Sequence, residues 1–125
     1  NSCYEAQMEF VIYHNPRCSK SRQTLSLLES KGVQTRVELY LENPLSEGNI
    51  KNLLEKLDIN ARDLIRKNEE EFKKSGLTLS SNEQALISAM AKSPKIIERP
   101  IVVCGERAVI GRPPENVLEL IENED

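Results

Sequence analysis

Hydrophobic and polar positions alternate along this chain of 125 residues in blocks that predict strands and helices by turns. An apolar run over residues 9–13 is typical of a buried strand, and residues 35–40 alternate weakly as a second strand. Between them, a helical spacing runs from about Cys18 to Lys31 and stops at Gly32, which can adopt the left-handed conformation that ends many helices. A helix that connects two strands in this way favours a parallel pair.

The middle of the chain has the spacing of amphipathic helices. Ser46 is a good N-cap, and the apolar positions after it recur at i, i+3, i+4 and i+7. These positions are Ile50, Leu53, Leu54 and Leu57. Asn60 is expected to cap a shorter helix, and Ser81 with Gln84 has the pattern of a capping box before a third helix. We therefore expect a helical block over about residues 46–95.

The last part of the chain predicts two strands and a helix. Residues 99–111 have the pattern of two strands joined through Gly105 as a tight antiparallel hairpin. Pro113 and Pro114 then precede the final helix. The resulting order is β-α-β, a helical block and β-β-α, which is the plan of the thioredoxin fold with an enlarged middle crossover. We predict an α/β, thioredoxin-like fold.

Length and charge narrow the class of protein. A chain of 125 residues fits a single domain, which we place over residues 8–125 with residues 46–95 as a helical insertion and residues 1–7 as a loose tail. The net charge of -3 argues against nucleic acid as a partner, because nucleic-acid-binding domains normally carry a basic excess. No apolar run approaches the roughly 20 residues that cross a bilayer, so we expect no membrane association.

The three cysteines, Cys3, Cys18 and Cys104, are odd in number and widely spaced. A disulfide framework or a zinc site would need paired ligands at short spacing, so we expect neither and no bound metal. Unpaired cysteines are typical of a reducing compartment, which favours the cytoplasm.

Cys18 is the candidate for chemistry, because it lies between a predicted strand and the start of a predicted helix. Backbone N–H groups and the helix dipole stabilise an anion there, and nearby cations lower a thiol pKa further. Ser21 lies one helical turn further on, where its hydroxyl could donate a hydrogen bond to the sulfur. A lone cysteine is more often a small buried apolar residue. The position and the flanking cations favour a reactive thiol here, while Arg17 and Arg22 themselves are expected to be mainly solvated.

The segment "YHNPRCSKSRQTL", residues 13–25, resembles the active-site segment of the glutaredoxin-coupled arsenate reductases. Members of that family have a strand, His-Asn-Pro, one residue and then the cysteine. The resemblance continues in "LIRKN" (residues 64–68), "ERPIVV" (residues 98–103) and "IGRPPENVL" (residues 110–118). The matches lie in order over nearly the whole chain, from about residue 9 to residue 121.

The resemblance implies a role for each matching position. Cys18 corresponds to the nucleophile, and His14 to a histidine that tunes the pKa of that cysteine. The arginines that hold the arsenic oxyanion correspond to Arg66, Arg99 and Arg112. Pro100 corresponds to the cis-proline opposite the reactive sulfur. The implied reaction is reduction of arsenate to arsenite, with glutathione as co-substrate, glutaredoxin as partner and no bound cofactor.

Elementary chemistry agrees with these roles. Guanidinium groups match oxyanion oxygens in pairs and keep their charge, and thiolate attack on an anion requires cations nearby. Arg99 and Arg112 flank predicted strands whose ends lie beside the Cys18 loop in this fold, whereas Arg66 depends on the resemblance. Cys104 lies four residues after Pro100, roughly 13 Å along an extended strand, so we interpret it as a core residue and not as a resolving thiol.

Three other functions remain open at this stage. A redox regulator that binds RNA polymerase can share this fold, but such regulators carry Cys-x-x-Cys and lack the late arginine, so Ser21 and Arg112 count against it. A monothiol-glutaredoxin-like transferase would need a glutathione groove in place of convergent arginines. An arsenate-reductase-like homologue with another thiol-redox role is the third, because Ser19 and Lys20 replace the family's frequent Gly-Thr.

Overall fold

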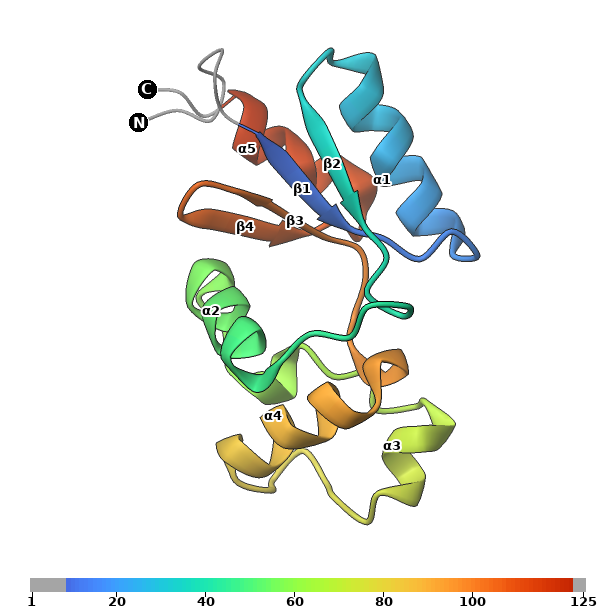
Figure 1. Cartoon of the computed structure of the whole chain (residues 1–125), viewed down its shortest axis with the longest axis vertical. Helices are drawn as coiled ribbons and strands as arrows, with labels where there is room; N and C mark the ends of the chain where they lie inside the picture. The colour runs from blue at the N-terminus through green and yellow to red at the C-terminus, as the bar shows by residue number, and fades with distance from the viewer. Residues whose placement is uncertain (1–8, 123–125) are drawn as a thin grey trace. The chain divides into compact units, whose positions relative to one another are not determined.

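The computed structural model describes residues 9–122, which fall into two units. Within these residues, one unit combines residues 9–39 with residues 99–122, and the other is Tyr40–Glu98 (Figure 1). The helical block expected over residues 46–95 lies within the second unit. Cys3 and the expected tail over residues 1–7 lie outside the described residues.

A four-stranded mixed sheet forms the centre of the first unit. Its strands are β1 (Phe10–Tyr13), β2 (Thr35–Glu38), β3 (Ile101–Cys104) and β4 (Arg107–Ile110), in the order β2-β1-β3-β4. The β1–β2 pair is parallel and the other two pairs are antiparallel, which confirms the predicted β-α-β unit and hairpin. Gly105 in the hairpin turn has φ 63°, a conformation that side chains disfavour.

Helices cover one face of this sheet (Figure 1). α1 is Ser19–Ser30, and the last predicted helix begins as a 3-10 turn, Pro114–Val117, before it continues as α5, Leu118–Glu122. The core between strands and helices consists of buried apolar side chains. They are Phe10, Ile12, Leu28, Val102, Cys104, Val117, Leu120 and Ile121. Cys104 has no exposed surface, which confirms its interpretation as a core residue.

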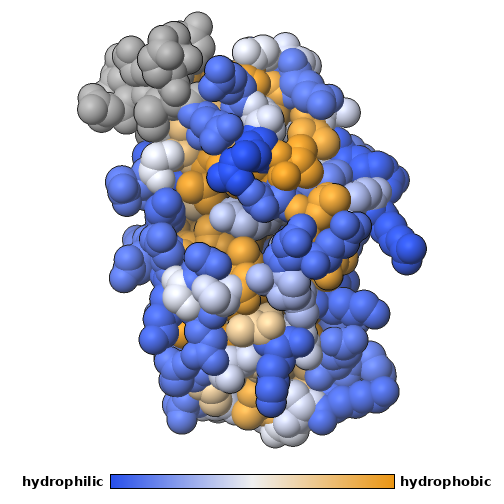
Figure 2. Space-filling view, in the orientation of Figure 1, coloured by the Kyte–Doolittle hydropathy of each residue, from blue (hydrophilic) through white to orange (hydrophobic). Residues whose placement is uncertain are grey.

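The second unit is helical, with α2 (Glu47–Leu57), α3 (Glu70–Lys74) and α4 (Glu83–Lys92). Ser46 caps α2 as predicted, since its side chain accepts from the Asn49 N–H at 3.0 Å. α2 and α4 contact each other and bury their apolar faces. Among residues 9–122, no helix combines the length and the apolar character that crossing a membrane requires. On the face in Figure 2, hydrophilic side chains predominate, with apolar patches between them.

The predicted helix after Asn60 is wrong beyond its first turn. Only Ala61–Asp63 form a 3-10 turn, and Ile65 then forms an antiparallel β-bridge with Ile97. The Glu98 N–H donates to the Leu64 carbonyl at 2.7 Å, so long-range pairing replaces the helical bonds.

The capping residue of α4 also differs from the prediction. Asn82, not Ser81, is the N-cap, and its side chain accepts from the Ala85 N–H at 2.8 Å. The Ser81 hydroxyl accepts instead from the Thr78 N–H at 3.0 Å, because the preceding turn already engages it. The helix therefore begins one residue later than the capping-box pattern indicated.

Candidate active site

Cys18 is the N-cap residue of α1, in extended conformation with φ -95° and ψ 124°. The loop before it is held by its own backbone and side chains: the Asn15 carbonyl accepts from the Cys18 N–H at 3.0 Å, and the Asn15 side chain accepts from the Arg17 N–H at 3.0 Å. The Cys18 carbonyl accepts the first helical bond, from the Arg22 N–H at 3.0 Å. The thiol is therefore fixed where the first N–H groups of a helix lack helical partners.

Several groups act on the Cys18 thiol in opposite directions. Burial is the largest influence and raises its pKa. The Ser21 backbone N–H, the charge of Arg99, the Lys20 backbone N–H and the Arg112 side chain all lower it, and together they leave the pKa below the ordinary value for a cysteine. Nη1 of Arg112 lies 3.7 Å from the sulfur. The combination favours a thiolate, which is the nucleophilic form of cysteine.

His14 and Ser21 form a buried pair beside Cys18. His14 Nδ1 lies 2.6 Å from the Ser21 hydroxyl oxygen, which also accepts from the Asn15 N–H at 3.0 Å. The expected bond from the Ser21 hydroxyl to the sulfur is therefore replaced, because the hydroxyl lies among these partners and the sulfur receives the Ser21 backbone N–H. Burial first, and then the charge of Arg22, lower the pKa of His14. The neutral form of His14 therefore predominates at pH 7, and the side chain is linked to Cys18 through Ser21.

Arg99 and Arg112 come from the two ends of the β3–β4 hairpin. Nη1 of Arg112 donates to the Arg99 carbonyl at 3.3 Å as well as approaching the sulfur. The peptide bond between Arg99 and Pro100 is cis, and so is the bond after Arg112. Gly111 ties these ends together, since its N–H donates to the Pro100 carbonyl at 2.9 Å. The first unit therefore brings both arginines to the start of α1.

Arg66 belongs to the second unit. Its Nη1 donates to the Lys95 carbonyl at 3.1 Å and pairs with the Glu69 carboxylate at 3.1 Å. Its backbone N–H donates to the Ile96 carbonyl at 2.7 Å. These bonds fix Arg66 beside the segment that continues along the chain into Arg99, and a role in oxyanion binding stays a prediction.

Arg22 is a structural part of the site that the sequence interpretation underestimated. Its Nη1 donates to the Pro16 carbonyl at 2.9 Å, so the guanidinium braces the turn before Cys18 as well as acting on His14. In the sequence, this role is indicated only by the position of Arg22 in the first turn of the helix, shortly after Pro16. That spacing alone does not show whether a long side chain folds back or extends into solvent.

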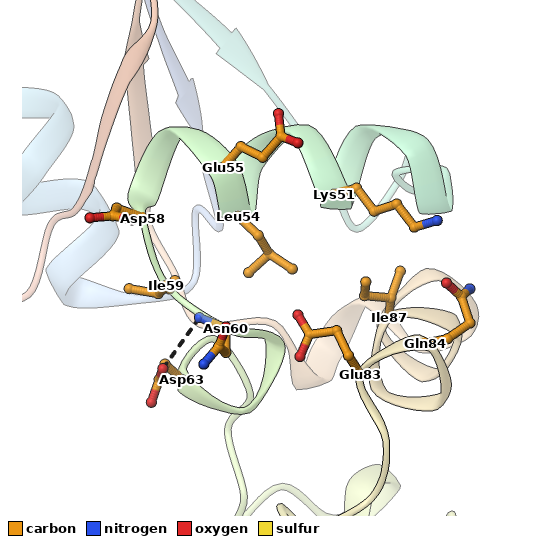
Figure 3. A pocket seen from close by; sticks show the side chains of 10 residues that line it. All are labelled: Lys51, Leu54, Glu55, Asp58, Ile59, Asn60, Asp63, Glu83, Gln84 and Ile87. Carbon is orange, nitrogen blue, oxygen red and sulfur yellow. Dashed lines mark hydrogen bonds between the residues drawn. The ribbon is translucent and has the colours of Figure 1, made fainter.

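A pocket of about 780 Å³ lies in the second unit, between α2, α4 and the turn at Asn60 (Figure 3). Two of its carboxylates bond to the backbone: Glu83 accepts from the Ala61 N–H at 3.0 Å, and Asp63 accepts from the Asn60 N–H at 3.3 Å. Over residues 9–122, no group of three or more His, Cys, Asp or Glu side chains is arranged to hold a metal ion. The chemistry described above is centred on Cys18, so this pocket is not the candidate active site.

Comparison with known proteins supports the interpretation from the residues. The ArsC family model matches residues 13–120. A Haemophilus influenzae protein named arsenate reductase is 45% identical over 116 residues, covering 91% of this chain and 100% of the relative. YfgD, an uncharacterized protein of Escherichia coli, is 54% identical over 112 residues, covering 88% of this chain and 94% of the relative. A solved structure titled arsenate reductase from Vibrio cholerae has a TM-score of 0.87 at 48% identity, covering 96% of this chain and 99% of that one, which confirms the predicted fold.

The Cys18 thiol should ionise below the value of a free cysteine, about 8.5. Because a lowered pKa means that the thiolate persists to lower pH, the rate of alkylation by iodoacetamide should reach half its maximum below that value. Arg112→Ala should raise the midpoint by removing a donor and a charge, while Arg17→Ala, whose backbone N–H is what bonds within the loop, should leave it unchanged. A midpoint at or above about 8.5 in the unaltered protein would contradict an activated thiol.

His14 is the sole histidine of the sequence, so an NMR titration follows one imidazole signal. Its pKa should lie below the usual value of about 6.5. Arg22→Gln should raise that pKa, because the substitution removes a cation that disfavours the protonated ring, and Arg17→Gln serves as the matched control. If neither substitution changes the pKa of His14, Arg22 does not act on this side chain.

Proposed function

The chain belongs to the ArsC family, and on that premise we propose that it reduces arsenate to arsenite with Cys18 as the nucleophile. The observation that carries the proposal is the thiol at the N-cap of α1, whose pKa is lowered and whose sulfur lies 3.7 Å from Arg112 Nη1. A nucleophile beside a guanidinium is what attack on an anionic centre requires.

The reaction balances as a transfer of two electrons from two thiols. The Cys18 thiolate forms a bond to arsenic, and one arsenate oxygen leaves as water after protonation. A glutathione thiolate then attacks the Cys18 sulfur, and the electron pair of the sulfur–arsenic bond stays on arsenic, which departs as arsenite. Cys18 is left in a mixed disulfide with glutathione, and glutaredoxin reduces that disulfide to restore the thiol.

The proposal takes the second thiol of the reaction from outside the protein, because the described residues hold no second cysteine that is exposed near Cys18. Of the cysteines in residues 9–122, Cys18 is partly exposed, whereas Cys104 has no exposed surface and lies in the core of the first unit. A buried core thiol cannot reach a disulfide at the start of α1 without unfolding its surroundings. Dependence on reduced glutathione places the protein in a reducing compartment, as the cytoplasm is.

Oxyanion binding is assigned to the three arginines. The proposal is supported by Arg112 Nη1, which lies 3.7 Å from the sulfur, and by the charge of Arg99, which lowers the pKa of Cys18. Planar guanidinium groups bind tetrahedral oxyanions through paired hydrogen bonds that a lysine cannot reproduce. Arg66 is included because it matches the family position in residues 64–68. Its hydrogen bond to the Lys95 carbonyl and its ion pair with Glu69 lie within the second unit.

Arsenate-dependent NADPH consumption, coupled through glutathione, glutathione reductase and glutaredoxin, measures the proposed activity. Cys18→Ser should abolish turnover, because a hydroxyl cannot form the sulfur–arsenic bond, while Cys104→Ser should keep most of it. Equal loss in both variants would point to an internal disulfide and against an external thiol. No arsenate turnover by a protein whose Cys18 still alkylates rapidly would favour a thiol-redox role with another substrate.

The same assay should distinguish the three proposed oxyanion-binding arginines from exposed cations, by the loss of activity when each is replaced. Losing a hydrogen-bonded charge partner of a bound anion costs about 2 to 5 kcal/mol. Arg66→Ala, Arg99→Ala and Arg112→Ala should each lower kcat/KM for arsenate by at least about tenfold, which corresponds to about 1.4 kcal/mol. Lysine at each position should recover only part of the loss. Arg17→Ala should have little effect, and a comparable loss there would show that the three positions are not special.

A further inference from the structure

The outer edge of β2 exposes a row of backbone hydrogen-bonding groups. β2 ends the sheet order, with β1 on its inner side (Figure 1). The carbonyls of Gln34 and Glu38 face β1, since they accept from the N–H groups of Phe10 at 2.8 Å and His14 at 2.9 Å. Because a strand alternates with a period of two, the N–H and C=O groups of Thr35 and Val37 point away from β1.

Two of the four side chains of β2, those of Arg36 and Val37, are exposed. Val37 is 42% exposed and, with Leu41 at 37%, is one of two exposed large apolar residues over residues 9–122. Its neighbours Arg36 and Glu38 carry opposite charges on the same face of the strand, where they pair with each other, and Arg36 also lies 3.5 Å from Glu9. Arg36 and Glu38 thus lie on one face of the strand, and Val37, between them in the sequence, lies on the other.

We propose that a second copy of this chain docks antiparallel along the β2 edge, with Val37 opposite Val37 of the second copy. Antiparallel partners that both face outward exchange two hydrogen bonds, and Val37 is such a residue in each copy. The contact is isologous, so the same patch serves both copies and the assembly closes as a dimer. The two sheets become one continuous sheet across the dyad.

Charge selects this register over its neighbours. With Val37 at the dyad, Arg36 lies opposite Glu38 of the second copy, and Glu38 lies opposite Arg36. A shift of two residues, the smallest that keeps outward groups facing each other, places Arg36 opposite Arg36 or Glu38 opposite Glu38. Like charges directly opposite each other are destabilising and opposite charges are stabilising. One register is therefore favoured over both adjacent alternatives.

The arrangement of these charges also differs from the one that usually protects an exposed edge strand. Exposed edges are commonly protected by charges, especially lysine, which repel a second copy at every register. An arginine and a glutamate placed symmetrically about an exposed valine repel in some registers and attract in one. The pattern thus suits a specific partner with the same sequence.

Sedimentation velocity of the full chain over a range of micromolar concentrations tests the proposal. The unaltered protein should show a monomer–dimer equilibrium. Arg36→Glu or Glu38→Arg alone should weaken it by at least about tenfold, because both symmetry-related pairs become like-charged. An equimolar mixture of the two single variants should dimerise again, and so should the double variant Arg36→Glu with Glu38→Arg. This recovery distinguishes pairing at this register from any general effect of charge.

Val37→Pro supplies a second, independent test. Proline removes the outward N–H of Val37, while the bonds of β2 to β1 through the Gln34 and Glu38 carbonyls do not use it. The dimer should be lost, and an unchanged Cys18 alkylation rate and far-UV spectrum would show that the fold is retained. A monomer at every concentration, or a dimer that tolerates both single charge reversals, would overturn the proposal.

Discussion

One close backbone approach holds the candidate site together. A Cβ atom on Gly111 would lie 2.7 Å from the Thr24 hydroxyl oxygen and 3.0 Å from Cγ of Pro100, so only glycine fits without displacing its neighbours. The Thr24 hydroxyl lies within hydrogen-bonding distance of the Gly111 carbonyl, at 3.2 Å, and so ties α1 to the end of β4. Because Arg99 precedes Pro100 and Arg112 follows Gly111, this contact places both arginines at the start of α1. The chemistry at Cys18 depends on that packing.

Burial affects the two titratable side chains of the site in opposite ways, and the difference defines their roles. It raises the pKa of Cys18, but backbone N–H groups and arginines more than offset it. It lowers the pKa of His14, and the Arg22 charge acts in the same direction. A neutral histidine cannot supply the positive charge that a thiolate needs. The cations that stabilise the thiolate, Arg99 and Arg112, are also two of the three arginines proposed to bind the oxyanion. In the proposed mechanism, the same charges therefore favour both thiol ionisation and substrate binding.

Local patterns in the sequence predicted most of the fold, because strands, the Gly105 turn and the Ser46 cap depend on neighbouring residues. The failures involve distant partners. A helix after Asn60 is locally reasonable, but the bridge between Ile65 and Ile97 provides bonds that no local pattern contains. Cys18 could be found from the sequence, since its position at a helix start is itself a local property. The orientation of the Ser21 hydroxyl toward His14 could not, because a buried hydroxyl follows the partners that the folded loop supplies.

The proposed role in oxyanion binding is supported by different observations for Arg99 and Arg112 than for Arg66. Arg99 and Arg112 act on the Cys18 pKa, so their proximity to the sulfur has a direct electrostatic consequence. Arg66 is bonded to the Lys95 carbonyl and to Glu69, so an oxyanion that recruits it must compete with a carboxylate for the same nitrogen. The bridge that replaced the predicted helix holds the Arg66 segment against residues 96–98, directly before Arg99. The helical unit thus holds Arg66 through backbone pairing with residues 96–98 as well as through the bonds of its side chain.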